Sequence, residues 1–439
     1  MSRFLVAATP AAGHVNPGLP IVRALTAAGH DVLVSTGPAF EAAVTAAGAR
    51  FVPMPAGTWI DAAELDTLFP ERARLTGARQ FRFDLRTFFT APAGAQAAHL
   101  LSLLPGFRPD AVVADTGFVG GGLVAEAAGV PFGVYGISVF PYASRDVAPF
   151  GSALPPRADL PGRVRNRVLG AALRRYVSGP SVAELNRQRT VVGLPPGRAT
   201  VLDWNDRTGL YLQLSPPGFD YPRSDLPTVV HEIGMPEPPV PPGWTPPPWW
   251  RDLAGRRVVV VTQGTVATDP ALLLRPALDG LAGLDVLVVA LTGGADPASL
   301  GPLPPNARAA AYAPYGPLLR SAAMMVTNGG FGGVQLAVAA GLPLVVAGRT
   351  EDKAEVAARV AWSGVGLDLR TQRPTPGMLA AAARQVLASP VLARRSAELA
   401  ARAPSADAPA RAVALLEELA RTGGPVHRSA SPTPSRHRA

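Results

Sequence analysis

Two side chains of types that can move a proton each follow a short apolar run. His14 lies in the loop 9–16 after the apolar run 4–8, and Asp115 directly follows the run 111–114. Both runs are typical of buried strands, and α/β folds bind ligands beyond the carboxyl ends of such strands. An imidazole suits general acid–base chemistry, and a carboxylate can orient it. A structural histidine and an aspartate that caps the next helix are the alternative interpretations.

A cluster of glycines supplies a second feature with chemical potential. Residues 324–347 are typical of a strand–turn–helix–strand unit, with strands over 324–327 and 344–347. The turn is Asn328-Gly329-Gly330, and Gly332 and Gly333 lie where the helix begins. The first backbone N–H groups of a helix have no intrahelical partner, so glycines there would let a phosphate approach. A tight turn packed on the sheet explains the same glycines, and the spacing is neither GxGxxG nor a P-loop.

A charged pair follows the second strand of this unit. Asp352 can accept hydrogen bonds from sugar hydroxyls, and Lys353 can pair with a phosphate or with Asp352. The alternative is an exposed beginning of a helix over 354–362. Lys353 is the single lysine of the chain.

The elements that position these groups alternate between strands and helices, which predicts two α/β lobes with parallel sheets. In the first half we predict strands over 4–8, 31–36, 49–52, 111–114 and 132–135, and helices over 17–28, 40–47 and 119–128. In the second half we predict strands over 257–262, 285–290 and 307–310, and helices over 270–282, 377–388 and parts of 390–420.

Composition divides the chain. Residues 215–250 are dense in proline and predict a semi-rigid linker, with one further strand over 228–233 and a tryptophan cluster that packs the linker onto a lobe. We therefore predict a first domain over 1–214 and a second over 251–405. A last helix follows over 406–421. Residues 422–439 lack apolar periodicity and are predicted to be disordered.

The overall composition excludes several classes of protein. The 439 residues include no cysteine, so disulfides and thiolate metal sites are absent. The formal charge of +9 comes almost entirely from scattered arginines without a nucleic-acid-binding motif, so we predict no nucleic-acid partner. The apolar run 1–9 is too short for a signal peptide, and no run is long enough to span a membrane, so a cytoplasmic protein is expected. The arginine-rich stretches 58–92 and 162–177 are interpreted as helices whose arginines face water. For 162–177 the alternative is contact with an anionic membrane surface.

Several of these segments resemble one protein family. VTNGGFGGVQLAVAAGLPLVV (326–346) and EDKAEVAARV (351–360) resemble the donor-binding motif of inverting, GT-B-fold glycosyltransferases of the UDP-glycosyltransferase superfamily. The segments 11–20, 114–131 and 312–319 add support, and the likeness is greatest to actinobacterial enzymes that glycosylate natural products, the macrolide type included. This sequence departs from the family at three positions. Asn328 replaces a histidine that contacts the diphosphate, Leu336 a glutamate that holds the ribose, and Lys353 a glutamine beside the donor sugar.

The resemblance implies a GT-B fold, in which two Rossmann-like lobes face each other across a cleft. The first lobe would bind the acceptor and the second the donor, and the last helix would cross back to the first lobe. His14 would be the general base, and Asp115 would hold its imidazolium. The implied donor-binding residues are Thr265, Tyr312 (whose ring would stack on the base), Ala313, Asn328, Gly329, Gly330, Gly332, Gly333, Asp352 and Lys353.

The implied reaction is transfer of a sugar from a UDP- or TDP-linked donor to a hydroxyl of a small lipophilic acceptor, with inversion, as in antibiotic biosynthesis. It would need no metal and no cofactor beyond the nucleotide-sugar co-substrate. A non-catalytic glycosyltransferase-like protein that activates a partner enzyme, or a nucleotide-sugar epimerase, would also explain the departures. The sequence leaves the sugar, the acceptor and the oligomeric state open.

Overall fold

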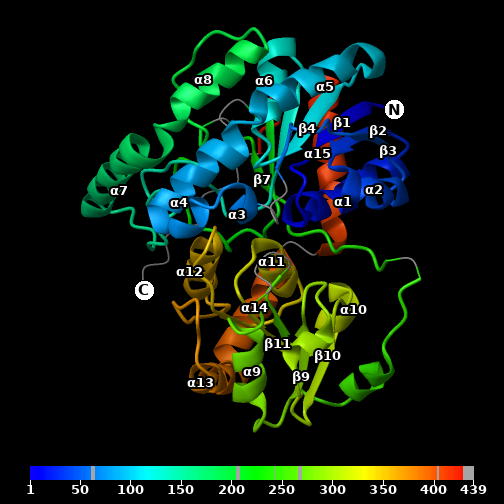
Figure 1. Cartoon of the computed structure of the whole chain (residues 1–439), viewed down its shortest axis with the longest axis vertical. Coiled ribbons are helices and arrows are strands. Elements are labelled where there is room, and N and C mark those ends of the chain that lie inside the picture. The colour runs from blue at the N-terminus through cyan, green and yellow to red at the C-terminus, as the bar shows by residue number, and fades with distance from the viewer. Residues whose placement is uncertain (61–64, 204–207, 242, 265–268, 403–404, 429–439) are drawn as a thin grey trace.

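Two α/β lobes lie one above the other in the computed structural model (Figure 1). The structure describes residues 1–60, 65–203, 208–241, 243–264, 269–402 and 405–428. Each lobe is built on one parallel sheet, which confirms the predicted two-lobed α/β class.

The N-terminal sheet has, within the described residues, seven strands in the order β3-β2-β1-β4-β5-β6-β7. All neighbouring strands are parallel, and Leu5 pairs with both Leu33 and Val112. Strand β4 is buried at every residue because helices cover both faces of the sheet. The strands are β1 (Arg3–Ala7), β2 (Asp31–Thr36), β3 (Arg50–Pro53), β4 (Ala111–Asp115), β5 (Phe132–Gly136), β6 (Leu210–Gln213) and β7 (Val230–Glu232).

The first helix begins earlier than the sequence predicts. Helix α1 spans Ala12–Ala27 and contains Pro17 and Pro20, so His14 lies on its first turn rather than in a loop. Burial of Val15, Ile21 and other apolar side chains against the sheet outweighs the two backbone hydrogen bonds that the prolines remove. The other helices of this lobe are α2 (Glu41–Ala46), α3 (Leu65–Leu68), α4 (Gly77–Asp84), α5 (Ala93–Phe107), α6 (Val119–Ala128), α7 (Leu160–Leu173) and α8 (Ser181–Val191). Helices α4 and α7 continue as π-helical turns over Leu85–Thr90 and Arg174–Ser178.

The C-terminal sheet has, over the same described residues, six parallel strands in the order β10-β9-β8-β11-β12-β13. They are β8 (Val258–Thr262), β9 (Leu287–Leu291), β10 (Ala307–Ala310), β11 (Ala322–Thr327), β12 (Leu344–Val346) and β13 (Gly366–Asp368). The helices are α9 (Leu274–Leu281), α10 (Tyr315–Arg320), α11 (Phe331–Ala339), α12 (Lys353–Ser363), α13 (Pro376–Leu387), α14 (Pro390–Arg402) and α15 (Ala408–Thr422).

Helix α15 returns to the N-terminal lobe, where it packs on α1 and on the strands β4, β5 and β6 (Figure 1). Leu416 and Leu419 pack over Gly133 of β5, and Glu417 Oε1 lies 2.9 Å from His30 Nε2. The chain therefore crosses between the lobes a second time, as the family resemblance implies.

Two predicted boundaries differ from the structure. The first half of the proline-rich segment belongs to the N-terminal lobe, because β7 joins its sheet and Phe219 is fully buried. The predicted disordered tail was wrong for its first residues. Val426 is buried, and its N–H donates to the Gly209 carbonyl, while the N–H of Arg428 donates to that of Thr228. Buried backbone groups and one apolar side chain are enough to hold a segment that has no periodic pattern.

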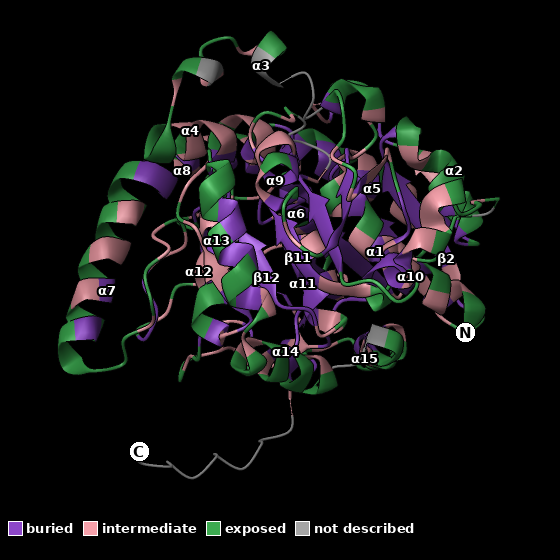
Figure 2. Ribbon diagram, turned by 90° about the horizontal axis from the view of Figure 1, so that it is seen from below, coloured by how far each residue is buried: buried purple, intermediate pink, exposed green. Residues whose placement is uncertain are grey.

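The outer faces of the helices carry most of the exposed surface, while the strands lie in the buried interior (Figure 2). The tryptophan cluster packs as predicted: the Trp244 and Trp250 rings lie 5.2 Å apart, and Trp249 and Trp250 contact the core. No helix among the described residues is both long enough and apolar enough to cross a bilayer.

Candidate functional site

The fold brings His14 and Asp115 into direct contact. The Nδ1 atom of His14 lies 2.7 Å from Oδ1 of Asp115, although the residues are 101 positions apart in the chain. Parallel pairing of β1 with β4 causes this, because α1 begins just after β1 and Asp115 ends β4. The His14 side chain is 15% exposed, and its Nε2 atom has no hydrogen-bond partner among the described residues. Asp115 thus holds the Nδ1 atom of the ring, and the Nε2 atom is available to exchange a proton with a ligand.

Asp115 is itself held in place. Its side chain is fully buried and accepts hydrogen bonds from the N–H groups of Thr9 at 2.6 Å and Gly117 at 2.7 Å. It does not cap the following helix: the N-cap of α6 is Phe118, and no side chain bonds there. The capping alternative is therefore excluded, and this carboxylate serves the imidazole and two loop amides.

The surroundings leave the imidazole little room to turn. The His14 and Phe89 rings lie 6.2 Å apart, and the Tyr135 hydroxyl donates to the His14 carbonyl at 3.0 Å. Burial, and then the charge of Asp115, raises the pKa of Tyr135 well above its ordinary value, so this hydroxyl stays protonated and can donate. Phe89 and Tyr135 lie far from His14 in sequence and carry no motif that would predict this contact.

The glycine turn lies at the N-terminus of α11. Gly329 has a φ of +92°, and a Cβ there would lie 2.8 Å from Val346, so both its conformation and its packing require glycine. Gly330 is the N-cap, and no side chain caps the helix. A Cβ on Gly332 would meet nothing within 4 Å. The first N–H groups of α11 are therefore uncapped beside open space, whereas Gly333 faces the Tyr315 hydroxyl, 3.6 Å from where its Cβ would be.

Asn328 does not present its amide to this open space. Its Nδ2 donates to the Gln263 carbonyl, and its Oδ1 accepts from the N–H of Gly330 at 3.3 Å. The side chain is buried and braces the turn from within. The sequence placed Asn328 among donor-binding residues, but here it holds the glycine turn against β8. Leu336 packs partly against the core.

The nucleotide-binding candidates are only partly brought together. Tyr312 follows β10, and its ring is 49% exposed, free to stack on a base. The Ala313 side chain is buried in the core, so only its backbone could face a nucleotide. Thr265 lies outside the described residues. Tyr315, which the sequence did not select, hydrogen-bonds Thr262 and lies against the glycine turn.

Asp352 and Lys353 begin helix α12 between the lobes. Ser138 Oγ donates to Asp352 Oδ2 at 2.5 Å. Burial raises the pKa of the Asp352 carboxyl, while the Ser138 hydroxyl and the nearby His14 act in the opposite direction. Lys353 is buried, pairs with Glu351 rather than Asp352, and donates to Thr350 at 3.3 Å; burial lowers its pKa to about 8. The alternative interpretation, an exposed beginning of the helix, is therefore wrong for Lys353.

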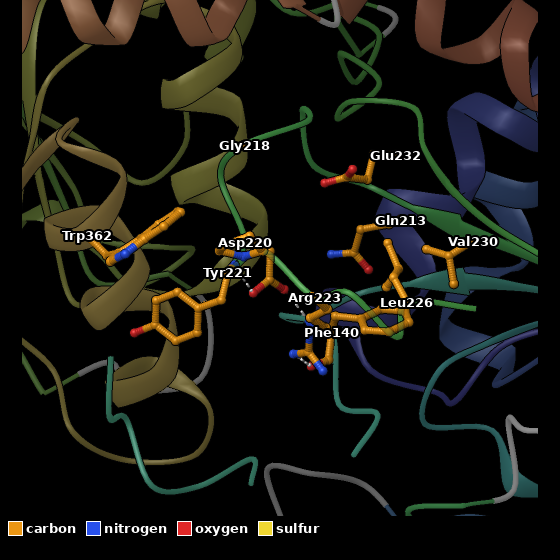
Figure 3. Close-up of a pocket in the computed structure, with 11 residues that line it drawn as sticks. Phe140, Gln213, Gly218, Asp220, Tyr221, Arg223, Leu226, Val230, Glu232 and Trp362 are labelled. Atoms are coloured by element: carbon orange, nitrogen blue, oxygen red, sulfur yellow. Dashed lines mark hydrogen bonds between the residues drawn. The ribbon is translucent and has the colours of Figure 1, made fainter. Parts of the chain in front are cut away.

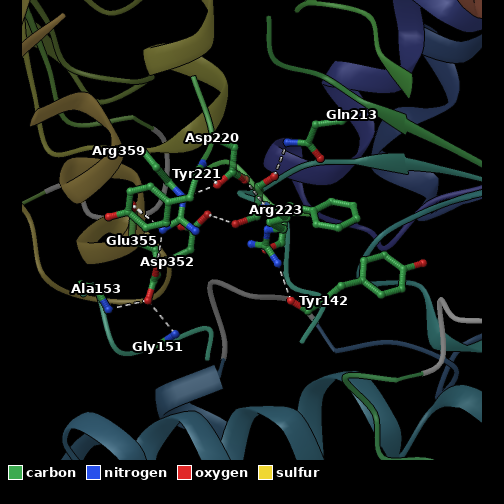
Figure 4. Close-up of polar contacts among 12 residues, drawn as sticks. Tyr142, Gly151, Ala153, Gln213, Asp220, Tyr221, Arg223, Asp352, Glu355 and Arg359 are labelled. Carbon is green, nitrogen blue, oxygen red and sulfur yellow. Dashed lines mark hydrogen bonds and ion pairs between the residues drawn. The ribbon is translucent and has the colours of Figure 1, made fainter. Parts of the chain in front are cut away.

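A buried ionic network joins α12 to the N-terminal lobe (Figure 4). Glu355 Oε1 accepts from the N–H groups of Gly151 at 2.8 Å and Ala153 at 2.6 Å, and its other oxygen pairs with Arg359. Arg359 Nε donates to Asp220 at 2.8 Å. Burial alone would raise the pKa of Asp220, but Arg359 and then Arg223 hold it below its ordinary value. The sequence missed this network; a Glu–Arg pair four residues apart on an otherwise apolar helix was the available signal.

A cavity of about 280 Å³ lies between the lobes beside this network (Figure 3). Trp362 and Tyr221 line one side of it, and Gln213 and Glu232 the other. None of the predicted site residues lines this cavity. It is connected to them indirectly, since Gln213 Nε2 donates to the carbonyl of Ser138, which bonds Asp352.

Known proteins resemble the chain over its whole length. It is 43% identical to 4'-demethylrebeccamycin synthase of Lentzea aerocolonigenes over 420 residues, 95% of this chain and 99% of the relative. The chain is a glycosyltransferase of the UDP-glycosyltransferase superfamily. It is also 31% identical to UDP-glucosyltransferase 1 of Beauveria bassiana, over 90% of this chain and 91% of that protein.

Further comparisons agree with this family. Residues 275–419 match the model "Erythromycin biosynthesis protein CIII-like, C-terminal domain". The crystal structure of CalG4, the calicheamicin glycosyltransferase, superimposes with a TM-score of 0.70 at 26% identity, over 96% of this chain and 99% of CalG4. The predicted GT-B architecture and the predicted enzyme class, a glycosyltransferase, are thus confirmed. The comparisons favour this enzyme class over the alternative of a non-catalytic protein that activates a partner enzyme.

Proposed function

We propose that this glycosyltransferase transfers a sugar, with inversion, from a UDP- or TDP-linked donor to a hydroxyl of a small lipophilic natural product. The observation that carries the proposal is the His14–Asp115 pair, which holds one imidazole nitrogen at 2.7 Å and leaves the other without a partner in the part of the chain that the structure describes. This arrangement is that of a general base with an orienting carboxylate.

In the proposed reaction, the acceptor hydroxyl gives its proton to His14 Nε2 as its oxygen bonds to the anomeric carbon. The bond between that carbon and the diphosphate oxygen breaks, so the nucleoside diphosphate leaves with the electron pair. Attack from the face opposite the leaving group inverts the anomeric centre. The buried Asp115 carboxylate stabilises the imidazolium that forms.

The C-terminal lobe would hold the donor. The uncapped N-terminus of α11, with open space at Gly332, suits a diphosphate, because free N–H groups and the helix dipole favour negative charge. These groups would also stabilise the charge that develops as the diphosphate leaves. Asp352, which His14 influences electrostatically, would accept hydrogen bonds from sugar hydroxyls, and Tyr312 would stack on the base.

The choice of substrates rests on relatives. UDP-glucosyltransferase 1 of Beauveria bassiana supports a UDP-linked donor, and the names of 4'-demethylrebeccamycin synthase and CalG4 support a natural-product acceptor. No metal and no further cofactor is proposed. No group of three potential metal ligands occurs among the described His, Asp and Glu residues. Chelation by EDTA is therefore expected to leave the transfer rate unchanged.

The test compares the protein with its His14→Ala variant. Transfer from UDP- and TDP-sugars to a panel of lipophilic natural products is followed by mass spectrometry, and UDP and TDP binding by calorimetry. We expect the variant to lose about 10²–10⁴-fold in transfer rate, the usual contribution of a general base, with the nucleotide Kd unchanged. Transfer at a near wild-type rate in the variant would exclude His14 as the base.

A further inference from the structure

Helix α7 stands at the edge of the N-terminal lobe and contacts the rest of the protein through a narrow face (Figures 1 and 2). Among its residues, only Gly162 and Asn166 are buried. Asn166 Nδ2 donates to the Arg145 carbonyl at 2.9 Å, and the Asp159 carboxylate caps the helix through the N–H of Gly162. The fully buried positions of α7 are thus a glycine and an asparagine, and Leu173 near its end packs partly against the core. Most of an ordinary surface helix's apolar residues would face the core, whereas α7 leaves several of its own exposed.

The opposite face of α7 carries aliphatic side chains in water. Leu160 is 77% exposed, Val164 56% and Val168 61%, and Tyr176 in the following π-helical turn is 66% exposed. The three aliphatic residues are spaced by four, so they form one stripe along the helix. Such a continuous apolar stripe on a surface typically marks an interaction site.

The same segment is strongly basic. Residues 160–178 contain five arginines and no acidic residue. Arg163 pairs with Asp146 at 3.1 Å, and Arg174 lies 3.5 Å from Asp203. Arg167 and Arg175 have no acidic partner among the described residues, and both are exposed. The stripe is thus bordered by positive charge that the protein itself does not neutralise.

We propose that this face of α7 docks on the surface of an anionic lipid bilayer. Aliphatic side chains bordered by arginines are the features by which a helix lies in a membrane interface, and juxtaposed arginines are attracted to anionic headgroups. A second copy of the chain would bring Arg167 and Arg175 against the same two arginines of its partner, and this like-charge repulsion disfavours it. Binding of a nucleic acid to the arginines would leave the aliphatic stripe exposed to water.

The position of α7 connects this docking with the proposed active site. The π-helical turn after α7 contacts α4. The chain beyond α4 carries Phe89, whose ring lies 6.2 Å from that of His14. Docking would therefore bring the His14 side of the N-terminal lobe near the bilayer, where a lipophilic acceptor accumulates. That last step rests on the proposed acceptor class, whereas the docking itself does not.

The test is flotation of the full chain with phosphatidylcholine vesicles, with and without phosphatidylglycerol, at low and at high salt. We expect binding to the anionic vesicles alone, and its loss at high salt. Arg167→Gln with Arg175→Gln should weaken binding about fivefold for each charge removed. Val164→Ser with Val168→Ser should weaken it by about tenfold or more together.

Controls in the C-terminal lobe remove the same two positive charges, or one valine that is 58% exposed, close to either valine of the stripe. Arg373→Gln with Arg384→Gln, and Val391→Ser, change exposed residues of the C-terminal lobe and should bind like the wild type. Absence of binding to anionic vesicles at low salt would overturn the proposal. So would an equal loss in the control variants, or α7 variants that alter only the oligomeric state measured by light scattering. All of these readouts are independent of glycosyl transfer.

Discussion

At the scale of single residues, the imidazole of His14 is positioned by the Asp115 carboxylate, whose own orientation is fixed by its surroundings. Asp115 is fully buried and accepts from two backbone amides in addition to the imidazole. Reorienting the imidazole would leave a buried carboxylate oxygen with fewer partners, which is costly. A base held in this way loses little entropy when an acceptor binds.

The Gly117→Ala variant tests this confinement. A Cβ at Gly117 would lie 2.7 Å from His14 Cε1, 2.9 Å from Phe89 and 3.0 Å from Asp115 Oδ1, so the imidazole or the Phe89 ring must shift. We expect the transfer rate to fall by about 10–100-fold, because small misplacements of a catalytic group are expensive, with nucleotide affinity unchanged. Gly106→Ala in α5, where a Cβ meets nothing within 4 Å, should keep full activity. Equal rates in the two variants would refute the confinement.

Asp352 is the residue proposed to bind the donor sugar, and its carboxylate accepts a hydrogen bond from Ser138 of the N-terminal lobe. Asp352→Ala should lower the transfer rate by about 10–100-fold, as expected when hydrogen bonds to a charged group are lost, while UDP or TDP binds as before. Ser138→Ala is the control, since it removes the 2.5 Å hydrogen bond but keeps the carboxylate, and should cost much less. Unchanged kinetics in Asp352→Ala would remove this residue from the site.

At the scale of elements, α12 has two functions. Its N-cap residue is Asp352, and Glu355 in its first turn accepts hydrogen bonds from the loop amides of Gly151 and Ala153 in the other lobe. Elements of the two lobes are therefore tied by one helix. Buried charges of this kind are stable only while each has its partners.

A double-mutant cycle on this network should be strongly non-additive. Glu355→Gln leaves Arg359, which is 2% exposed, with Asp220 as its single remaining carboxylate in the network. We expect a loss of about 3 kcal/mol in the free energy of unfolding, measured with urea, because a buried charge loses its partner. Glu355→Gln with Arg359→Met should recover part of that loss.

The control is Asp279→Asn, which removes the carboxylate of the partly exposed Arg275–Asp279 pair on α9. This substitution should lower the free energy of unfolding by less than about 1 kcal/mol. Strictly additive losses at Glu355 and Arg359 would contradict the coupling.

At the scale of the whole molecule, three connections hold the lobes together among the residues that the structure describes. The proline-rich segment joins them covalently, α15 packs on the N-terminal sheet, and the network around α12 binds the facing loops. The cavity of about 280 Å³ beside that network is bordered by Glu232, which is partly buried. Burial, and then the charge of Asp220, raises the pKa of Glu232 from its ordinary 4.5 to about 7.

Glu232 should make the stability of the whole protein depend on pH. The native state holds its proton up to about pH 7 and the unfolded state only up to 4.5, so this contribution to stability is full below 4.5 and is lost as the pH rises through 7. Glu232→Gln cannot lose a proton. The free energy of unfolding, measured with urea, should therefore change differently in the two proteins. Between pH 5 and pH 8, that of the variant should rise by on the order of 2 kcal/mol relative to that of the wild type. Glu41→Gln, at an exposed position in α2, should show no such pH-dependent gain.

Sequence alone determined the features that depend on neighbours along the chain. Alternating apolar runs and helical segments predicted both parallel sheets, because strands and helices have their own periodicities. The turn before α11 was recognisable because glycines replace side chains at four nearby positions. His14 and Asp115 were candidates because each follows a strand. The family likeness then supplied the class of reaction.

Only the tertiary structure decided which groups meet. His14 contacts a carboxylate 101 residues away, Asn328 turns inward to a carbonyl of β8's loop, and Glu355 binds the other lobe. The face of α7 that is exposed is likewise invisible in its sequence, since periodicity predicts an apolar stripe but not the side that is covered. The physical reason is the same in each case: these contacts join segments far apart in the chain, and their partners are fixed by strand order and lobe packing rather than by local sequence pattern.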